Sequence, residues 1–193
     1  AGNDTEGLRY GTIGTPEKFF LRWKEDEEDS SQLQLDKYLA KICNKKRLLE
    51  IIHDFVLFDG GIKKLPRYHQ YFGIKAAQEH VRRREGGIIW HTQGSGKSIV
   101  MVMLAKWILE NNPNARVAIL TDRTELDKQI ERVFNDAGEP LIRTSSGREL
   151  MEQLSQPSPR LLCSLIHKFG KKEVENFDKF IEELRSGPTQ TVG

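Results

Sequence analysis

The sequence has 193 residues, of which 37% are hydrophobic and 30% are charged, and its formal net charge at pH 7 is +2. A chain of this length has room for one good core and an appendage. No apolar run approaches the roughly 20 residues that a membrane helix needs, so we expect no membrane-spanning helix in this sequence. The nearly neutral charge gives no global attraction for nucleic acid, so any such binding must be local.

Three features indicate the cellular compartment of the protein and whether the chain is a fragment. Cys43 and Cys163 lie far apart within apolar patterns, and we interpret them as buried, reduced thiols of a cytoplasmic protein rather than as a disulfide or metal site. No secretory signal peptide is recognisable. The sequence starts without Met and ends on a stretch rich in Gly and Thr, so we expect a fragment of a larger protein.

Residues 1–64 are predicted to form a mainly helical linker segment. The sequence Thr-Pro-Glu at 15–17 predicts a helix start, with Thr as the N-cap and an acidic residue in the first turn. The acidic run at 25–29 ends that helix in a solvated loop. Apolar residues at 33–58 follow helical spacing, with a break into two helices at Asn44. No catalytic residue is evident in this segment.

A further helix is predicted over residues 66–85. Its last turn carries three arginines at 82–84. These side chains either complement the negative end of the helix dipole or form a patch that contacts phosphate, and both interpretations stay open.

After Gly86 the pattern changes to short apolar runs that alternate with helices. The runs are 88–90, 116–120, 141–142 and 161–166, and helices are predicted from residues 96, 124 and 146. Such alternation predicts an α/β fold with a parallel sheet and crossover helices. A capping box begins at Ser146, and Gly138 suits the end of the preceding helix.

The most specific motif is HTQGSGKS at residues 91–98. A phosphate-binding loop (P-loop) has the pattern Gly, four residues, Gly-Lys-Ser/Thr, and here His91 stands at the first glycine position. An apolar run precedes the loop and a very apolar helical pattern follows it, as a P-loop requires. An ordinary glycine-rich turn with an exposed lysine is the alternative.

Each residue type in this loop matches a need of a bound triphosphate. Gly94 and Gly96 permit the backbone angles that let N–H groups converge on phosphate oxygens, and the helix start adds its positive dipole end. The side chain of Lys97 offers a charge for the β- and γ-phosphates, and the hydroxyl of Ser98 offers a ligand for Mg²⁺. The predicted ATP-binding residues of the loop are Gln93, Gly94, Ser95, Gly96, Lys97 and Ser98, with Lys97 also predicted to be catalytic.

Arg67 and Gln70 form a second nucleotide signal, Arg-x-x-Gln at a predicted helix start. A glutamine amide both donates and accepts hydrogen bonds, as the edge of adenine does. The pattern precedes Lys97 by one helix and resembles the Gln motif of superfamily 2 helicases. We therefore predict that Arg67 and Gln70 belong to the ATP site.

Two further segments resemble helicase motifs that touch the nucleic-acid backbone. LTDRTEL, at residues 120–126, resembles motif Ia, and SLIHKF, at residues 164–169, resembles the segment after the next strand. Each can also be an ordinary turn between a strand and a helix. The predicted DNA-binding residues are Thr121, Arg123, Ser164 and Lys168.

The motifs RYHQYF, GGIIWHTQGSGKS, LTDRTELDKQI and SLIHKFG, in this order, resemble the motor region of the type I restriction enzyme R subunit. The segments EGLRYGT, EKFFLRWK and HDFVLFDG resemble the part that joins the family's nuclease domain to its motor. The resemblance implies an incomplete first RecA-like lobe at residues 65–193 after the linker at 1–64. It also implies ATP and Mg²⁺ as cofactors, translocation of duplex DNA before cleavage, methyltransferase and specificity subunits as partners, and a cytoplasmic location.

Parts of the family pattern are missing from this sequence. The nuclease residues, an Asp and a Glu-x-Lys pair, are expected before residue 1. No apolar run ends in Asp-Glu-x-His, so the Walker B acids that hold Mg²⁺ are absent, and so is the second motor lobe. We therefore expect an enzyme as the parent protein and an ATP-binding piece here. The alternatives are another superfamily 2 helicase, a small P-loop kinase or NTPase, and a non-catalytic interaction module with a vestigial loop.

Overall fold

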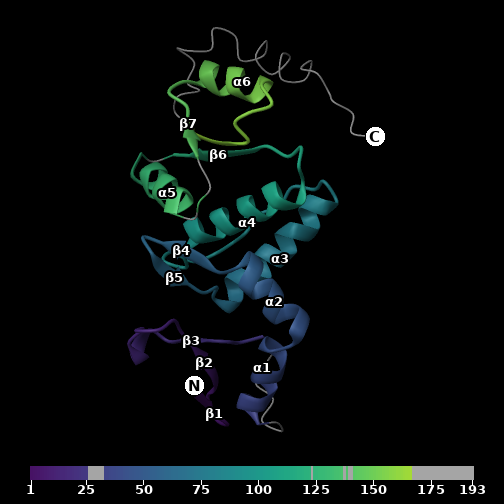
Figure 1. Cartoon of the computed structure of the whole chain (residues 1–193), viewed down its shortest axis with the longest axis vertical. Helices are drawn as coiled ribbons and strands as arrows, with labels where there is room; N and C mark the ends of the chain where they lie inside the picture. The colour runs from purple at the N-terminus through teal and green to yellow at the C-terminus, as the bar shows by residue number, and fades with distance from the viewer. Residues whose placement is uncertain (26–32, 123, 137, 139–140, 167–193) are drawn as a thin grey trace. The chain divides into compact units, whose positions relative to one another are not determined.

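The computed structural model describes residues 1–25, 33–122, 124–136, 138 and 141–166. The chain divides into two compact units, Ala1–Ile108 and Leu109–Gly193. Figure 1 follows the helices and strands of both units along the chain. Within the described residues, no helix is both long enough and apolar enough to cross a membrane.

The first unit begins with a small antiparallel sheet of three strands in the order β1-β2-β3. The strands are β1 (Gly2–Asn3), β2 (Gly7–Tyr10) and β3 (Leu21–Arg22). The helix predicted at 15–17 is wrong, because only a 3₁₀ turn, η1 (Glu17–Phe19), forms there, without a side-chain cap. The hydroxyl of Thr15 is hydrogen-bonded to the hydroxyl of Thr12 at 2.9 Å instead.

The two helices predicted over residues 33–58 are confirmed as α1 (Gln34–Ile42) and α2 (Lys45–Asp54). Asn44 separates them, as predicted, because its side-chain oxygen accepts hydrogen bonds from two N–H groups in the first turn of α2. Cys43, at the end of α1, is exposed, so its predicted burial is wrong. α1 packs against β2 (Figure 1).

A hairpin and a long helix complete the middle of the first unit. The hairpin pairs β4 (Leu57–Asp59) with β5 (Ile62–Lys64), and the helix is α3 (Tyr68–Arg82). The core of this unit is aromatic. The Trp23 ring centroid lies 5.5 Å from that of Tyr71, which lies 4.8 Å from that of Phe55. Burial of these large rings fixes the residues around β3 against α3.

The loop at 91–96 leads directly into α4 (Lys97–Asn111). The strand predicted at 88–90 does not form among the described residues, and the side chains of Ile88 and Trp90 are about nine-tenths exposed. A strand requires a hydrogen-bonded neighbour, and no described strand pairs with this run. Residues 85–92, which lead into the turn of the loop, form neither helix nor strand.

The second unit contains the predicted parallel sheet. Its strands β6 (Val117–Thr121), β7 (Ile142–Arg143) and β8 (Leu161–Leu165) lie in the order β6-β8-β7. Both strand pairs are parallel, and all five residues of β8 are buried. The crossover helices are α5 (Thr124–Asp136) and α6 (Gly147–Ser155). This alternation of strand and helix confirms the predicted α/β fold.

The helix ends of the second unit follow their sequence signals. The side chain of Ser146 accepts a hydrogen bond from the Glu149 N–H at 3.1 Å, as an N-cap does. The Glu149 carboxylate, however, accepts from the backbone N–H of Ser145 rather than from that of the N-cap. Gly138 has a φ of +80° and lies just after α5, as predicted for a helix C-terminus.

Candidate nucleotide-binding site

The P-loop turns through two glycines in the left-handed region of the backbone. Gly94 has a φ of +75° and Gly96 a φ of +81°, angles that other residues adopt only with strain. α4 then begins at Lys97, and the Val100 N–H in its first turn donates to the carbonyl of the preceding Gly96 at 3.2 Å. The N–H groups in the first turn of a helix have no acceptor within it, so they are available to an anion.

The ammonium group of Lys97 lies over this loop. Its Nζ donates hydrogen bonds to the carbonyl oxygens of Thr92 at 2.9 Å and of His91 at 3.3 Å. The side chain is exposed, and so is Gln93, whereas Ser98 is half-buried. A phosphate group that entered the loop would therefore meet a positive charge already held beside it.

Gln70 is brought to the loop from the first turn of α3. Its side chain is buried, with 3% exposed, and its Nε2 donates to the Ser95 carbonyl at 2.8 Å. Its Oε1 accepts from the Arg67 N–H at 2.9 Å. The reverse orientation of the amide would set oxygen against oxygen, so these bonds fix which end is nitrogen. The amide is engaged at both ends, and the Arg67 side chain is exposed.

Sterics give a further reason for glycine at position 96, one that the sequence motif alone does not provide. A Cβ built on Gly96 would lie 2.5 Å from Nε2 of Gln70, a separation that real Cβ atoms essentially never show. The buried amide and the loop backbone therefore touch without an intervening side chain. The two predicted nucleotide signals form one continuous structure.

Two histidines, His69 and His91, also contact each other beside the loop, and the sequence analysis did not predict this contact. The ring centroids of His69 and His91 are 5.1 Å apart at an angle of 86°. Partial burial, together with nearby His91 and Arg67, holds the pKa of His69 below its ordinary value. His69 is therefore uncharged at neutral pH. Their positions in the sequence could have indicated this contact, because His69 adjoins Gln70 and His91 is the first residue of the loop.

The predicted DNA-binding residues lie in the second unit. Thr121 ends β6 and Ser164 lies in the neighbouring strand β8, with 5% and 0% of their surfaces exposed. Neither hydroxyl has a hydrogen-bond partner among the described residues. Arg123 and Lys168 lie outside the described residues. Contact of these four residues with DNA stays a prediction.

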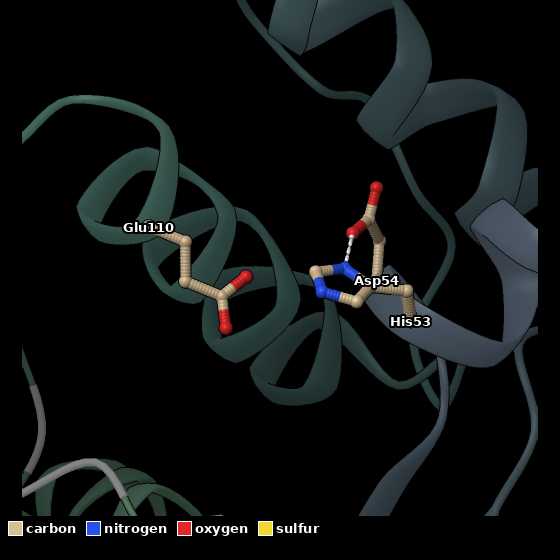
Figure 2. A group of neighbouring side chains, drawn as sticks. All are labelled: His53, Asp54 and Glu110. Carbon is tan, nitrogen blue, oxygen red and sulfur yellow. Dashed lines mark hydrogen bonds and ion pairs between the residues drawn. The ribbon is translucent and has the colours of Figure 1, made fainter.

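A third histidine lies at the end of α2. His53 Nδ1 and Asp54 Oδ1 are 2.5 Å apart, and the His53 side chain is 73% exposed (Figure 2). Glu110, drawn in the same figure, belongs to the second unit. We assign no metal site to these residues.

Comparison with known proteins identifies the family of the nucleotide-binding structure. The sequence profile described as SWI2/SNF2 ATPase matches residues 69–187, which include His69, Gln70, the P-loop and the parallel sheet. The chain belongs to the SWI2/SNF2 ATPase family. The α/β architecture is accordingly that of a partial RecA-like helicase lobe, as predicted.

Curated relatives of this SWI2/SNF2 ATPase chain are subunits of restriction enzymes. The type I restriction enzyme HindI endonuclease subunit of Haemophilus influenzae is 32% identical over 87% of this chain and 18% of its own length. The candidate type I restriction enzyme MjaIXP endonuclease subunit of Methanocaldococcus jannaschii is 28% identical over 93% of this chain and 20% of its own. The chain thus spans about a fifth of these relatives. The predicted resemblance to the type I restriction enzyme R subunit is confirmed.

Proposed function

We propose that this chain is the ATP-binding part of the motor in a type I restriction endonuclease subunit, a motor that translocates duplex DNA before cleavage. One observation carries the proposal: the positive-φ turn of the P-loop meets both Lys97 and the buried amide of Gln70. A loop of this kind cradles phosphate oxygens with backbone N–H groups. Its similarity to restriction enzyme endonuclease subunits supports the choice of motor.

The roles follow from the chemistry of each group. The Lys97 ammonium would exchange its bonds to loop carbonyls for bonds to the β- and γ-phosphates, and the Ser98 hydroxyl would be a ligand of Mg²⁺. Gln70 and Arg67 would contact the base. For Gln70 to contact adenine, its amide must exchange or share its bonds to the protein. The backbone N–H groups of residues 93–96 would complete the cradle, for which the Ser95 N–H must exchange its bond to the Thr92 carbonyl.

The parent assembly is also part of the proposal. A translocase of this class works with methyltransferase and specificity subunits on duplex DNA in the cytoplasm. Residues 1–64 would join its nuclease to the motor, and residues 65–193 would begin the first motor lobe. Because no apolar run of the sequence ends in the Asp-Glu-x-His of a Walker B motif, the chain by itself should bind Mg-ATP and hydrolyse it negligibly.

Thermal unfolding with and without saturating Mg-ATP tests the nucleotide site. A ligand present at 100 times its dissociation constant, and bound only to the folded state, stabilises by about 2.7 kcal/mol. We expect a clear rise in the unfolding midpoint that Lys97→Ala abolishes. Lys63→Ala, which removes an exposed lysine from β5, is the matched control and should keep the rise. A rise that persists in Lys97→Ala would contradict the proposed site.

Fluorescence anisotropy with two unrelated duplexes tests the DNA role. With two or three phosphate contacts, the log–log dependence of affinity on salt should have a slope of roughly −2 to −3. Arg123→Ala should reduce the magnitude of this slope by about one and weaken both duplexes alike. Strong preference for one duplex, or an unchanged slope in the variant, would remove the support for DNA binding through Arg123.

A further inference from the structure

The hydroxyl group of Tyr10 in β2 donates a hydrogen bond to the Pro66 carbonyl at 2.6 Å, across 56 residues of sequence. Burial raises the pKa of Tyr10, so the hydroxyl keeps its proton and remains a donor at any physiological pH. The ring is packed 6.1 Å from the ring of Trp23, which has 1% of its surface exposed. The position of this hydroxyl is therefore fixed by the core.

The Pro66 carbonyl and the Arg67 N–H belong to the same peptide group. The oxygen of this group accepts from Tyr10, and its N–H donates to Oε1 of Gln70 at 2.9 Å. The other end of the Gln70 amide donates to the Ser95 carbonyl in the P-loop at 2.8 Å. An unbroken chain of hydrogen bonds thus runs from the N-terminal sheet through one peptide group and one side-chain amide to the loop.

Such a chain couples its ends in two ways. Amide groups linked head to tail polarise one another, so each bond strengthens the next. The rigid plane of the peptide also transmits orientation, because tilting its carbonyl tilts its N–H. Loss of the Tyr10 hydroxyl would leave a carbonyl short of a partner and let this peptide group rotate. Oε1 of Gln70 would then lose a fixed donor, and the amide would no longer be held in place to donate to the Ser95 carbonyl.

Aromatic packing holds the N-terminal sheet and α3, which the hydrogen bonds connect, in a fixed relative position. The ring of Trp23 lies 5.5 Å from that of Tyr71 and 5.9 Å from that of Phe72, the two residues that follow Gln70 in α3. Its indole N–H also donates to Glu25, which is paired with Arg47 of α2. The N-terminal segment and the first turn of α3 are parts of one rigid core.

We propose that Tyr10 is a positioning residue for the P-loop, and that the N-terminal segment controls the loop's conformation through the peptide group between Pro66 and Arg67 and the amide of Gln70. The effect on the loop stands on these contacts alone. The consequence for ATP affinity rests on the proposed function. On this proposal, the segment that precedes the motor helps to position the nucleotide-binding loop.

The test uses Tyr10→Phe, which removes the hydroxyl and keeps the ring. Hydrogen–deuterium exchange of the chain without nucleotide should become about three- to tenfold faster in peptides covering 92–100, the ratio expected for loss of one net hydrogen bond. ATP affinity should fall by a similar factor. Tyr38→Phe, another buried tyrosine of the first unit, is the control and should change neither quantity. Unchanged exchange at 92–100 in Tyr10→Phe would overturn the proposal.

A double-mutant cycle separates positioning from general destabilisation. Gln70→Ala breaks the same chain from the loop side, so it should also accelerate exchange at 92–100. If the chain is continuous, adding Tyr10→Phe to Gln70→Ala changes that exchange no further. Additive effects would mean that Tyr10 acts through overall stability and would overturn the proposal. If the wild-type chain binds no ATP, the proposed function fails, whereas the exchange experiment still decides the role of Tyr10.

Discussion

The side-chain amide of Gln70 donates a hydrogen bond to the carbonyl oxygen of Ser95 at 2.8 Å. This bond joins the first turn of α3 to the P-loop, and it places a buried polar group directly against the loop backbone. A buried amide that loses its partner costs more free energy than the bond itself contributes. The geometry of the loop before nucleotide arrives therefore depends on α3.

Replacing Gln70 by Ala tests whether this amide also recognises the base. The variant leaves the Arg67 N–H and the Ser95 carbonyl without their partner, so we expect a loss of about 1–3 kcal/mol in the free energy of unfolding. If the amide reads adenine as well, ATP affinity should fall more than GTP affinity, as isothermal titration would show. Gln78→Ala, the other buried glutamine of α3, is the control. Equal losses for the two nucleotides would assign Gln70 to support of the loop alone.

The two loop glycines should differ in their tolerance of a side chain. Gly94→Ala meets no neighbouring atom, so it carries only the strain of a positive φ, about 1–2 kcal/mol. Gly96→Ala adds a clash with Gln70 to the same strain and should weaken Mg-ATP more, measured by equilibrium binding. Gly86→Ala, in open space without a positive φ, is the matched control and should bind like wild type. Equal affinity of the two loop variants would show that Gln70 does not pack against Gly96.

The lowered pKa of His69 makes the stability of the first unit depend on pH. The folded state disfavours protonation of this histidine, so the unfolded state binds more protons below about pH 6.5. Stability should therefore be full above that pH and fall as the pH drops toward the lowered pKa. His69→Gln should flatten this fall in thermal unfolding between pH 7.5 and 5.5. His80→Gln, a histidine elsewhere on α3, is the control, and identical profiles for wild type and His69→Gln would refute the assignment.

Ser146 caps α6, and its loss should destabilise the second unit. Ser146→Ala removes the acceptor of the Glu149 N–H, at a cost of about 1 kcal/mol in the free energy of unfolding. Chemical denaturation followed by circular dichroism measures the loss. Ser155→Ala, an exposed serine at the other end of α6, should cost less. A smaller loss at Ser146 than at Ser155 would contradict its role as the N-cap.

The sequence by itself determined the elements whose signals are local. The break at Asn44, the cap at Ser146 and the glycine turn of the P-loop were predicted from residues that act within a few positions. The strands of the parallel sheet were predicted from the alternation of apolar runs with helices. Caps and turns arise from bonds between near neighbours. The spacing of apolar residues along the chain indicates a helix or a strand without reference to the element that will pack against it. Such features are encoded where they form.

The tertiary structure decided everything that depends on a distant partner. The run at 88–90 has the composition of a strand, yet it forms none because a strand requires a neighbour to pair with. The contacts of Tyr10 with Pro66 and of Gln70 with Ser95 cross 56 and 25 residues. No local pattern records them, because their free energy comes from burial and geometry that exist only once the segments have met.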